Sequence, residues 1–384
     1  MESLVTMAFA DCYRGKCILV TGHTGFKGSW LCEWLLSLGA RVHGYALDPE
    51  PQATLFDQLG LPARLSSDTR ADLADRERLA AIITRVCPDF VFHLAAQPLV
   101  RLSYERPVET FHTNVLGTIY LLEALRSLDK PCAAVLATTD KCYENQEWIY
   151  GYREEDPLGG HDPYSASKAA CEIAIHSWRR SFFKQHPVRI ASARAGNVIG
   201  GGDWATDRIV PDCVRALQAG RPILVRNKNA TRPWQHVLDP LSGYLWLAAR
   251  LYQLTAPCPP LSTTNYQPAS PLSSAFNFGP GHDANRTVAE LVTEVLKSWP
   301  GRWEDKSEPA KAHEAGLLQL CTDKASILLG WSPVWRFPEA VREAVAWYRL
   351  NPPGNEPHVV HEFTCQQIAS YTRRATELAV PWVV

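Results

Sequence analysis

Two short stretches contain side chains whose types and spacing suit the oxidation of an alcohol. The first, A-T-T-D-K-C-Y-E-N at 137–145, follows the apolar run 133–136, so its side chains should emerge where a buried parallel strand ends. The second, Y-S-A-S-K at 164–168, reads as the start of a helix with Tyr164 and Lys168 four residues apart on one face. A tyrosine beside a lysine ammonium loses its proton more easily, which suits a base that takes a proton from an alcohol.

The first stretch also contains groups that a simple alcohol dehydrogenase does not need. Asp140 and Lys141 place an acid next to a base directly after the strand, and this pair indicates chemistry beyond oxidation. The two stretches can act together only if the rest of the chain brings them to one place.

A glycine-rich turn near the start of the chain predicts a dinucleotide site. The apolar strand 17–20 leads into T-G-H-T-G-F-K-G, and an amphipathic helix follows at 29–38. Gly22 permits the tight turn, Gly25 lets the backbone approach a pyrophosphate, and Gly28 lets the helix pack on the strand. The pyrophosphate would rest on the helix N-terminus.

The next strand, 42–47, ends in Asp48, which can accept hydrogen bonds from both ribose hydroxyls and repels a 2′-phosphate. It therefore favours NAD over NADP. The alternative is a glycine turn followed by an unrelated surface aspartate.

Further polar and small residues stand at element ends. A helix is expected at 76–86 and a buried strand at 89–94, whose His93 should make a hydrogen bond within the core. Small residues after that strand would let a flat cofactor lie close to the backbone. Asn114, within a helix expected at 107–125, is either a buried amide that bonds nearby backbone or an organiser of the active site, and the two roles are compatible.

Alternating strands and helices up to about residue 198 predict an α/β fold, with a doubly wound parallel Rossmann sheet and a smaller α/β lobe toward the C-terminus. We expect an NAD-binding domain at 15–198, with returns near 238–254 and 275–280, and a substrate-binding lobe at 199–237 and 281–350. The Pro/Ser-rich segment 255–274 is expected to be an insertion, and 351–384 a C-terminal tail. The remaining expected elements are a strand at 189–194 and helices at 164–183, 241–251, 287–297 and 338–350.

The composition excludes several other classes of protein. The 384 residues include 46% hydrophobic and 21% charged side chains with a net charge of −1, which gives no reason to expect a nucleic-acid or membrane surface. Eleven scattered cysteines without a C-x-x-C motif favour free thiols in a reducing compartment and predict neither disulfides nor a metal site. The apolar runs are too short to span a membrane, and a signal peptide is not expected, so we expect a cytoplasmic protein.

Taken in order, these motifs make the chain similar to the extended short-chain dehydrogenase/reductases, and among them it resembles the CDP-glucose 4,6-dehydratase family. The resemblance covers most of residues 15–350. The motifs that carry it are T-G-H-T-G-F-K-G-S-W-L, T-T-D-K-C-Y-E-N, G-G-H-D-P-Y-S-A-S-K, N-V-I-G-G-G-D-W-A and A-T-R-P-W-Q-H-V.

The resemblance implies NAD as cofactor, CDP-glucose as substrate and a homodimer or tetramer paired through the helices that contain Asn114 and Tyr164. The implied cofactor-binding residues are Gly22, His23, Gly25, Phe26, Gly28, Asp48, Asp72, Leu73, Ala95, Ala96, Gln97, Asn114, Tyr164 and Lys168. The implied substrate-binding residues are Asn197, Arg208, Arg232 and Gln235. His23 stands where many relatives carry glycine, and its larger side chain is expected to weaken cofactor retention.

The implied reaction yields CDP-4-dehydro-6-deoxy-D-glucose and water, a step toward deoxysugars of O-antigen type. Tyr164 and Lys168 would form the redox pair, with Thr139 sharing the hydrogen bond to the sugar O4. Asp140, protonated, would donate to the departing 6-hydroxyl. Lys141, where related dehydratases hold a glutamate, is either the base that removes the C5 proton or a residue that positions substrate or tunes Asp140.

Two other functions stay open. One is another nucleotide-sugar dehydratase or an NAD-dependent nucleotide-sugar epimerase, although an epimerase eliminates no water and has no need of the Asp140–Lys141 pair. The other is a non-catalytic NAD-sensing protein, which could lose Tyr164 and Lys168 freely.

Overall fold

The computed structural model describes residues 8–49, 54–206, 208–255, 270–307, 317–352 and 354–383. Its centre is a seven-stranded sheet in the order β11-β6-β5-β4-β1-β2-β3, with every pair parallel. The strands are β1 (Cys17–Thr21), β2 (Arg41–Ala46), β3 (Ser67–Arg70), β4 (Phe90–His93), β5 (Cys132–Ala137), β6 (Val188–Ala195) and β11 (Ala275–Phe278). This order, which runs outward in both directions from β1, confirms the predicted doubly wound α/β fold.

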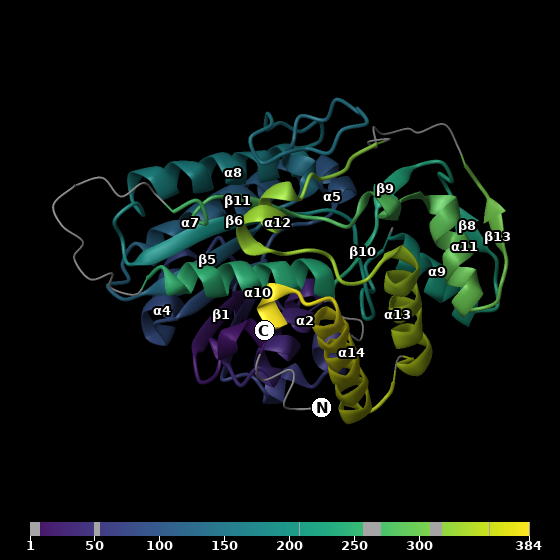
Figure 1. Ribbon diagram of the computed structural model, residues 1–384, viewed down its shortest axis with the longest axis horizontal. Coiled ribbons are helices and arrows are strands. Elements are labelled where there is room, and N and C mark those ends of the chain that lie inside the picture. The colour runs from purple at the N-terminus through teal and green to yellow at the C-terminus, as the bar shows by residue number, and fades with distance from the viewer. Residues whose placement is uncertain are drawn as a thin grey trace.

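Helices cover both faces of the sheet (Figure 1). One face packs on α4 (Arg76–Val86), α7 (Gly117–Leu125) and α8 (Pro163–Ser181), and the other on α2 (Phe26–Ser37) and α10 (Leu238–Gln253). Alternate residues of one strand therefore enter different cores. Leu19 of β1 packs in the core formed with α4, α7 and α8, and Ile18 and Val20 pack in the core formed with α2 and α10. Both faces being buried explains why the strands are apolar without alternation.

A smaller group of elements lies beside the carboxyl ends of the strands, at the right of Figure 1. It contains three two-stranded sheets and the helices that pack on them. The elements are β7 (Val198–Ile199) with β10 (Gln235–His236), β8 (Ile223–Val225) with β13 (Trp303–Asp305), β9 (Thr231–Pro233) with β12 (Asn285–Thr287), α9 (Ile209–Gln218), α11 (Val288–Ser298) and α13 (Phe337–Leu350). Three further short helices are α3 (Leu55–Gln58), α5 (Val100–Glu105) and α12 (Asp323–Leu329).

The helix predicted at 107–125 is interrupted. It consists of α6 (Pro107–Phe111), a π-helical turn at His112–Leu116 and then α7. A π-turn inserts one extra residue into the helical repeat, and such turns are frequent at functional sites. Hydrophobic periodicity could not reveal it, because the flanking segments continue the same apolar face.

The segment treated as a tail contains a long helix, α14 (Pro357–Glu377), which packs on α2 and α3. The fully buried Glu33 of α2 binds Arg64 through both carboxylate oxygens, at 2.6 and 2.7 Å, and lies 3.0 Å from His361 of α14. The ring of Trp382 stacks on Phe9 at 4.9 Å between centroids and on Tyr371 at 5.9 Å. The C-terminal segment is therefore part of the core. Most of the expected insertion, 256–269, lies outside the described residues.

Replacing Trp382 with Ala should lower the free energy of unfolding by about 3–5 kcal/mol, because the loss of a fully buried indole leaves a cavity beside Phe9 and Tyr371. Leu378→Ala, in the same segment but 45% exposed, is the control and should cost about 0.5 kcal/mol. Urea unfolding followed by circular dichroism measures both. Equal losses in the two variants would show that the C-terminal segment does not contribute to the core.

Candidate active site

The structure brings the two stretches with catalytic residue types into contact. Thr139 follows the end of β5 and caps a short 3-10 helix (Asp140–Cys142), accepting a hydrogen bond from the Lys141 N–H at 3.3 Å and donating one to Asp140 Oδ1 at 3.0 Å. Tyr164 lies in the first turn of α8, and its phenol shares a hydrogen bond with the Thr139 hydroxyl. Lys168 lies one turn further, with Nζ 3.5 Å from the carbonyl oxygen of Ala137.

Asp140 is a buried acid in a surrounding of positive charge. Burial raises its pKa, against the opposing effects of Lys141, Arg232 and Lys27, and this favours the protonated carboxyl. Its Oδ2 lies against Gly196 and has no hydrogen-bond partner among the described residues. A protonated carboxyl with one oxygen unpaired can donate a proton to a group that enters the site.

The titration of Tyr164 differs from the expectation that Lys168 lowers its pKa. Burial raises the pKa of Tyr164, and the largest effect that lowers it is the hydrogen bond with Thr139. Burial also lowers the pKa of Lys168. Thr139 is therefore the closest electrostatic partner of the tyrosine, a role that residue spacing along the helix could not indicate.

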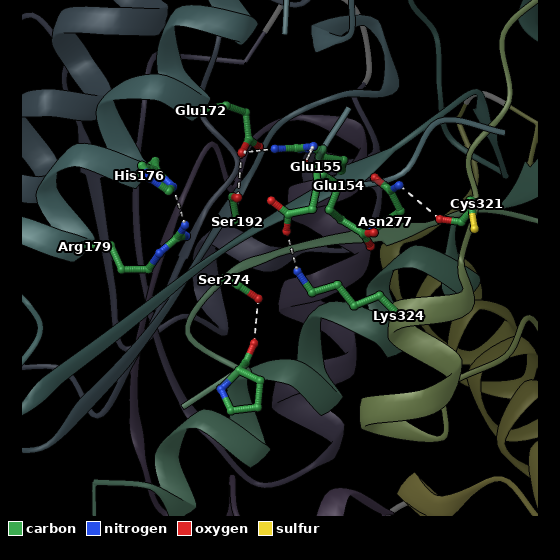
Figure 2. Close-up of polar contacts among 12 residues, drawn as sticks. Glu154, Glu155, Glu172, His176, Arg179, Ser192, Ser274, Asn277, Cys321 and Lys324 are labelled. Carbon is green, nitrogen blue, oxygen red and sulfur yellow. Dashed lines mark hydrogen bonds and ion pairs between the residues drawn. The ribbon is translucent and has the colours of Figure 1, made fainter. Parts of the chain in front are cut away.

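A buried ion pair between Glu172 and Arg194 adjoins these residues, and Figure 2 shows Glu172 with its partner Ser192. The Glu172 carboxylate, one turn beyond Lys168, accepts hydrogen bonds from Thr138 at 2.5 Å, from Ser192 at 2.8 Å and from Arg194 at 2.8 Å. Burial works against ionisation of Glu172, but the charge of Arg194 and these hydrogen bonds lower its pKa. The pair thus fixes α8 relative to the ends of β5 and β6.

The network continues into the loop between the two catalytic stretches. Arg194 also donates to the Tyr143 hydroxyl at 2.7 Å and to the Glu154 carbonyl at 3.0 Å. Tyr143 donates to Asn277 of β11, whose amide in turn donates to the carbonyl of Cys321 at 3.0 Å, as Figure 2 shows for the last pair. The sequence analysis missed this network. The indication of this network in the sequence was Glu172, a glutamate four residues after Lys168 on the same face of the helix.

Asn114 fulfils both roles that were considered for it. Its Oδ1 accepts a hydrogen bond from the Gln97 N–H at 2.8 Å, and its Nδ2 donates to the Gln97 carbonyl at 3.2 Å and to Ser167 at 2.8 Å. Ser167 belongs to the Y-S-A-S-K stretch of α8. A single buried amide in the π-turn therefore connects the loop after β4 to the catalytic helix.

The glycine turn has the close packing that a dinucleotide site requires. A Cβ on Gly28 would lie 2.1 Å from the Gly22 carbonyl oxygen, and one on Gly22 would lie 2.6 Å from the Ala95 nitrogen. Gly22 also has a positive φ of 75°. Gly25 caps α2 without a side-chain hydrogen bond, so the first N–H groups of the helix are available to an anion.

The side chain of His23 points away from this turn. It is fully buried beneath the loop, with Nε2 2.8 Å from Asp68 and the ring against Phe56 and Gly44. The imidazole fills the space over Gly44 and therefore lies away from the turn. The expected effect of His23 on cofactor retention stays a prediction.

The other predicted cofactor residues lie along the carboxyl ends of the strands. Asp48 is exposed after β2, and Ala95, Ala96 and Gln97 are half-buried after β4. Asp72 is exposed and accepts a hydrogen bond from the Ala74 N–H, whereas Leu73 is buried against Gly117. His93 bonds Thr21 at 2.7 Å and Thr118 at 3.2 Å, which confirms its expected role as a core residue.

The predicted substrate residues separate into two groups. Arg208 pairs with Asp203 at 3.2 Å and acts electrostatically on Tyr164, and Arg232 acts on Asp140, so both arginines lie at the site. Gln235 is buried, and its Nε2 donates to the Phe278 carbonyl at 3.1 Å, whereas its Oε1 has no hydrogen-bond partner among the described residues. Asn197 is half-buried, and its carbonyl accepts a hydrogen bond from the Gln235 N–H.

A doubly wound sheet with a glycine turn and a Thr/Tyr/Lys group at its carboxyl edge is the arrangement of a dinucleotide-dependent enzyme that acts on alcohols. A sequence model of the GDP-mannose 4,6 dehydratase family matches residues 19–258. The chain therefore belongs to this family.

Two individual relatives and one solved structure are similar to the chain over most of its length. The chain is 44% identical to a CDP-glucose 4,6-dehydratase of Salmonella typhimurium, over 88% of this chain and 91% of the relative. It is 29% identical to a dTDP-glucose 4,6-dehydratase of Streptomyces antibioticus, over 88% of this chain and 94% of the relative. The solved UDP-glucose 4-epimerase of Thermus thermophilus in complex with NAD superposes with a TM-score of 0.69 at 25% identity, covering 86% of this chain and 98% of that one. These comparisons confirm the resemblance drawn from the motifs.

Replacing Glu172 with Gln should lower the free energy of unfolding by about 3–5 kcal/mol at neutral pH, because Arg194 would stay buried without its counter-charge. Ionised Glu172 stabilises the fold above its unfolded pKa of about 4.3, and this contribution is lost as the pH falls through the lower folded-state pKa. The variant should therefore lose less stability than the wild type across that acidic range.

Urea unfolding at several pH values measures both effects. Glu377→Gln, which removes an exposed pair with Arg374, is the control and should change stability by about 0.5 kcal/mol. A Glu172→Gln variant as stable as this control would contradict the role given to the buried pair.

Proposed function

We propose that the chain is an NAD-dependent CDP-glucose 4,6-dehydratase that converts CDP-D-glucose to CDP-4-dehydro-6-deoxy-D-glucose and water. The observation that carries this proposal is the buried Asp140 beside the Thr139–Tyr164 hydrogen bond, because it adds a proton donor to a site for alcohol oxidation. The extent of the similarity to the Salmonella enzyme supports CDP-glucose as the substrate. Residues 199–237 and 281–350 are the proposed substrate lobe.

The glycine turn fits NAD. The N–H groups at the start of α2, after the Gly25 cap, would hold the pyrophosphate, while Gly22 and Gly28 allow the close backbone packing of the turn, and Asp48 follows β2, where it would bind the adenosine ribose. When bound, NAD takes a hydride from C4 of the sugar and later returns it to C6, so that no net oxidation remains.

Tyr164 takes the proton of the 4-hydroxyl in its ionised form, which burial disfavours and the hydrogen bond with Thr139 supports. Thr139 would hold the same sugar oxygen through its own hydroxyl. A ketone at C4 makes the C5 proton acidic, since the resulting carbanion is an enolate. Asp140 then donates its proton to the departing 6-hydroxyl, which leaves as water. Burial raises the pKa of this carboxyl and so favours the protonated form that the donation requires.

Lys141 has two candidate roles. Its charge is, after burial, the largest influence on the pKa of Asp140, so it lies next to the acid. From this position it would either remove the C5 proton or position the substrate and tune Asp140. Lys141→Met distinguishes the two, because loss of solvent deuterium incorporation at C5 is expected only for the base.

We further propose a homodimer or tetramer and a cytoplasmic location. Apolar side chains are exposed on α6 (Val108, Phe111) and on α8 (Ile173), and such a face supports pairing of two copies, which sedimentation equilibrium would measure. Ten cysteines in the described residues are free thiols, which agrees with a reducing compartment. In the described residues, helices of membrane-spanning length and apolarity are absent.

Incubation of the purified protein with NAD and CDP-glucose should produce a 4-keto sugar, detected by its absorbance in alkali and by mass spectrometry as loss of one water. Tyr164→Phe should reduce turnover by at least about 100-fold, because the proton acceptor is lost. GDP-mannose, dTDP-glucose and UDP-glucose serve as competing substrates. A product of unchanged mass with an inverted C4 centre would identify an epimerase, the second candidate that the Thermus structure supports.

Asp140→Asn should reduce the release of water by about 10²–10⁴-fold while leaving the oxidation at C4 measurable, because an amide cannot donate the proton to the 6-hydroxyl. The measurement follows deuterium incorporation at C5 and formation of the 6-deoxy product separately. Asp11→Asn, which removes an exposed carboxylate that pairs with Arg14, is the control. Full turnover by Asp140→Asn would exclude this residue as the general acid.

A further inference from the structure

Three side chains with metal-binding chemistry meet where α14 packs on α2, on the face of the sheet opposite α8. Glu33 belongs to α2, and His361 and Cys365 stand four residues apart on one face of α14. The Oε1 atom of Glu33 lies 3.0 Å from His361 Nδ1 and 3.4 Å from Cys365 Sγ. Nδ1 and Sγ are 3.5 Å apart, so an oxygen, a nitrogen and a sulfur form a compact triangle.

The sides of this triangle match a tetrahedral zinc site. Zinc binds carboxylate oxygen and imidazole nitrogen at about 2.0–2.1 Å and thiolate sulfur at about 2.3 Å, so its ligand atoms lie about 3.3–3.6 Å apart. The two separations that involve Cys365 Sγ, 3.4 and 3.5 Å, fall within this range. The separation between His361 Nδ1 and Glu33 Oε1 is about 0.3 Å shorter than the ideal value, a small shift for an imidazole that is 38% exposed.

Arg64 holds the Glu33 carboxylate in an orientation that suits a metal ligand. Its guanidinium donates to Oε2 at 2.6 Å and to Oε1 at 2.7 Å. A carboxylate offers about four lone-pair positions, so this bidentate pair leaves Oε1 a second one for an ion. Carboxylates that bind metals are commonly fixed by such an outer partner. Because Zn²⁺ with one carboxylate and one thiolate is neutral, Arg64 keeps its place beside the bound ion.

We propose that Glu33, His361 and Cys365 bind one zinc ion that fastens α14 to α2. His361 and Cys365 are partly exposed, so the ion enters from solvent, and water takes the fourth position. On binding, the Cys365 thiol releases its proton to water and the Sγ–Zn bond forms. Hydrogen bonds alone make poor use of the group, since a thiol is a weak donor. The lack of a C-x-x-C motif does not bear on this site, because its ligands come from two helices. The inference goes beyond the proposed function and does not depend on it.

Titration of the metal-stripped full-length protein with ZnCl₂, and absorption spectra with Co²⁺ in place of zinc, test the proposal. The wild type should bind one Zn²⁺ per chain and show a thiolate-to-cobalt charge-transfer band. His361→Ala and Cys365→Ser should each weaken Zn²⁺ binding by at least about 100-fold, because each removes one of three ligands, and Cys365→Ser should lose the band. His358→Ala and Cys87→Ser, which remove exposed residues outside the group, are the matched controls and should bind as the wild type does.

Thermal unfolding separates this site from loose surface binding. An ion that binds only the folded state raises the unfolding midpoint, so Zn²⁺ should stabilise the wild type and both controls but neither His361→Ala nor Cys365→Ser. Circular dichroism shows whether each variant is folded, and the wild-type cobalt spectrum tests for a sulfur ligand even where a variant is not. A wild type without the charge-transfer band would overturn the inference. Variants of His361 and Cys365 that bind zinc as tightly as the controls would do the same and would leave a hydrogen-bonded group only.

Discussion

The buried ion pair between Glu172 and Arg194 is the interaction on which the geometry of the site depends. Burying two charges is unfavourable unless their hydrogen-bonding capacity is used, and here Thr138, Ser192, Tyr143 and the Glu154 carbonyl use most of it. Nε of Arg194 is buried without a partner among the described residues. The pair joins α8 to β5 and β6, the three elements that carry or adjoin the catalytic residues. The Glu172 carboxylate binds Thr138, the residue before Thr139, and Glu172 belongs to α8, the helix that contains Tyr164. The same carboxylate therefore holds Thr139 and Tyr164 close together.

A second polar connection approaches the same helix from the opposite side. Asn114 uses its amide to join the loop after β4 to Ser167, and the π-turn is what directs this side chain inward. The Y-S-A-S-K helix is thus fixed at Ser167 and at Glu172, on either side of Lys168. Such an arrangement favours a site whose groups are in place before a substrate binds.

The electrostatics of the site follow from where each group is buried. Asp140 is buried, which raises its pKa and favours the protonated carboxyl, while the charges of Lys141, Arg232 and Lys27 act in the opposite direction. A carboxyl that can donate a proton beside cationic side chains suits a substrate that contains both a diphosphate and a hydroxyl that must leave as water. The similar proteins include both dehydratases and an epimerase. The sheet therefore does not distinguish the two activities, and the charge distribution of the site is what favours a dehydratase.

Local sequence determined the doubly wound sheet, the glycine turn and the two catalytic stretches, because strand apolarity, helix periodicity and glycine spacing are properties of short segments. Tertiary structure alone decided that His23 turns inward over Gly44 and that Gln235 donates to the Phe278 carbonyl. It also decided that α14 packs on α2, where Glu33 meets residues more than 300 positions away. Contacts between residues so distant in sequence leave no periodic pattern of hydrophobic residues in either segment. Only the folded chain therefore reveals them.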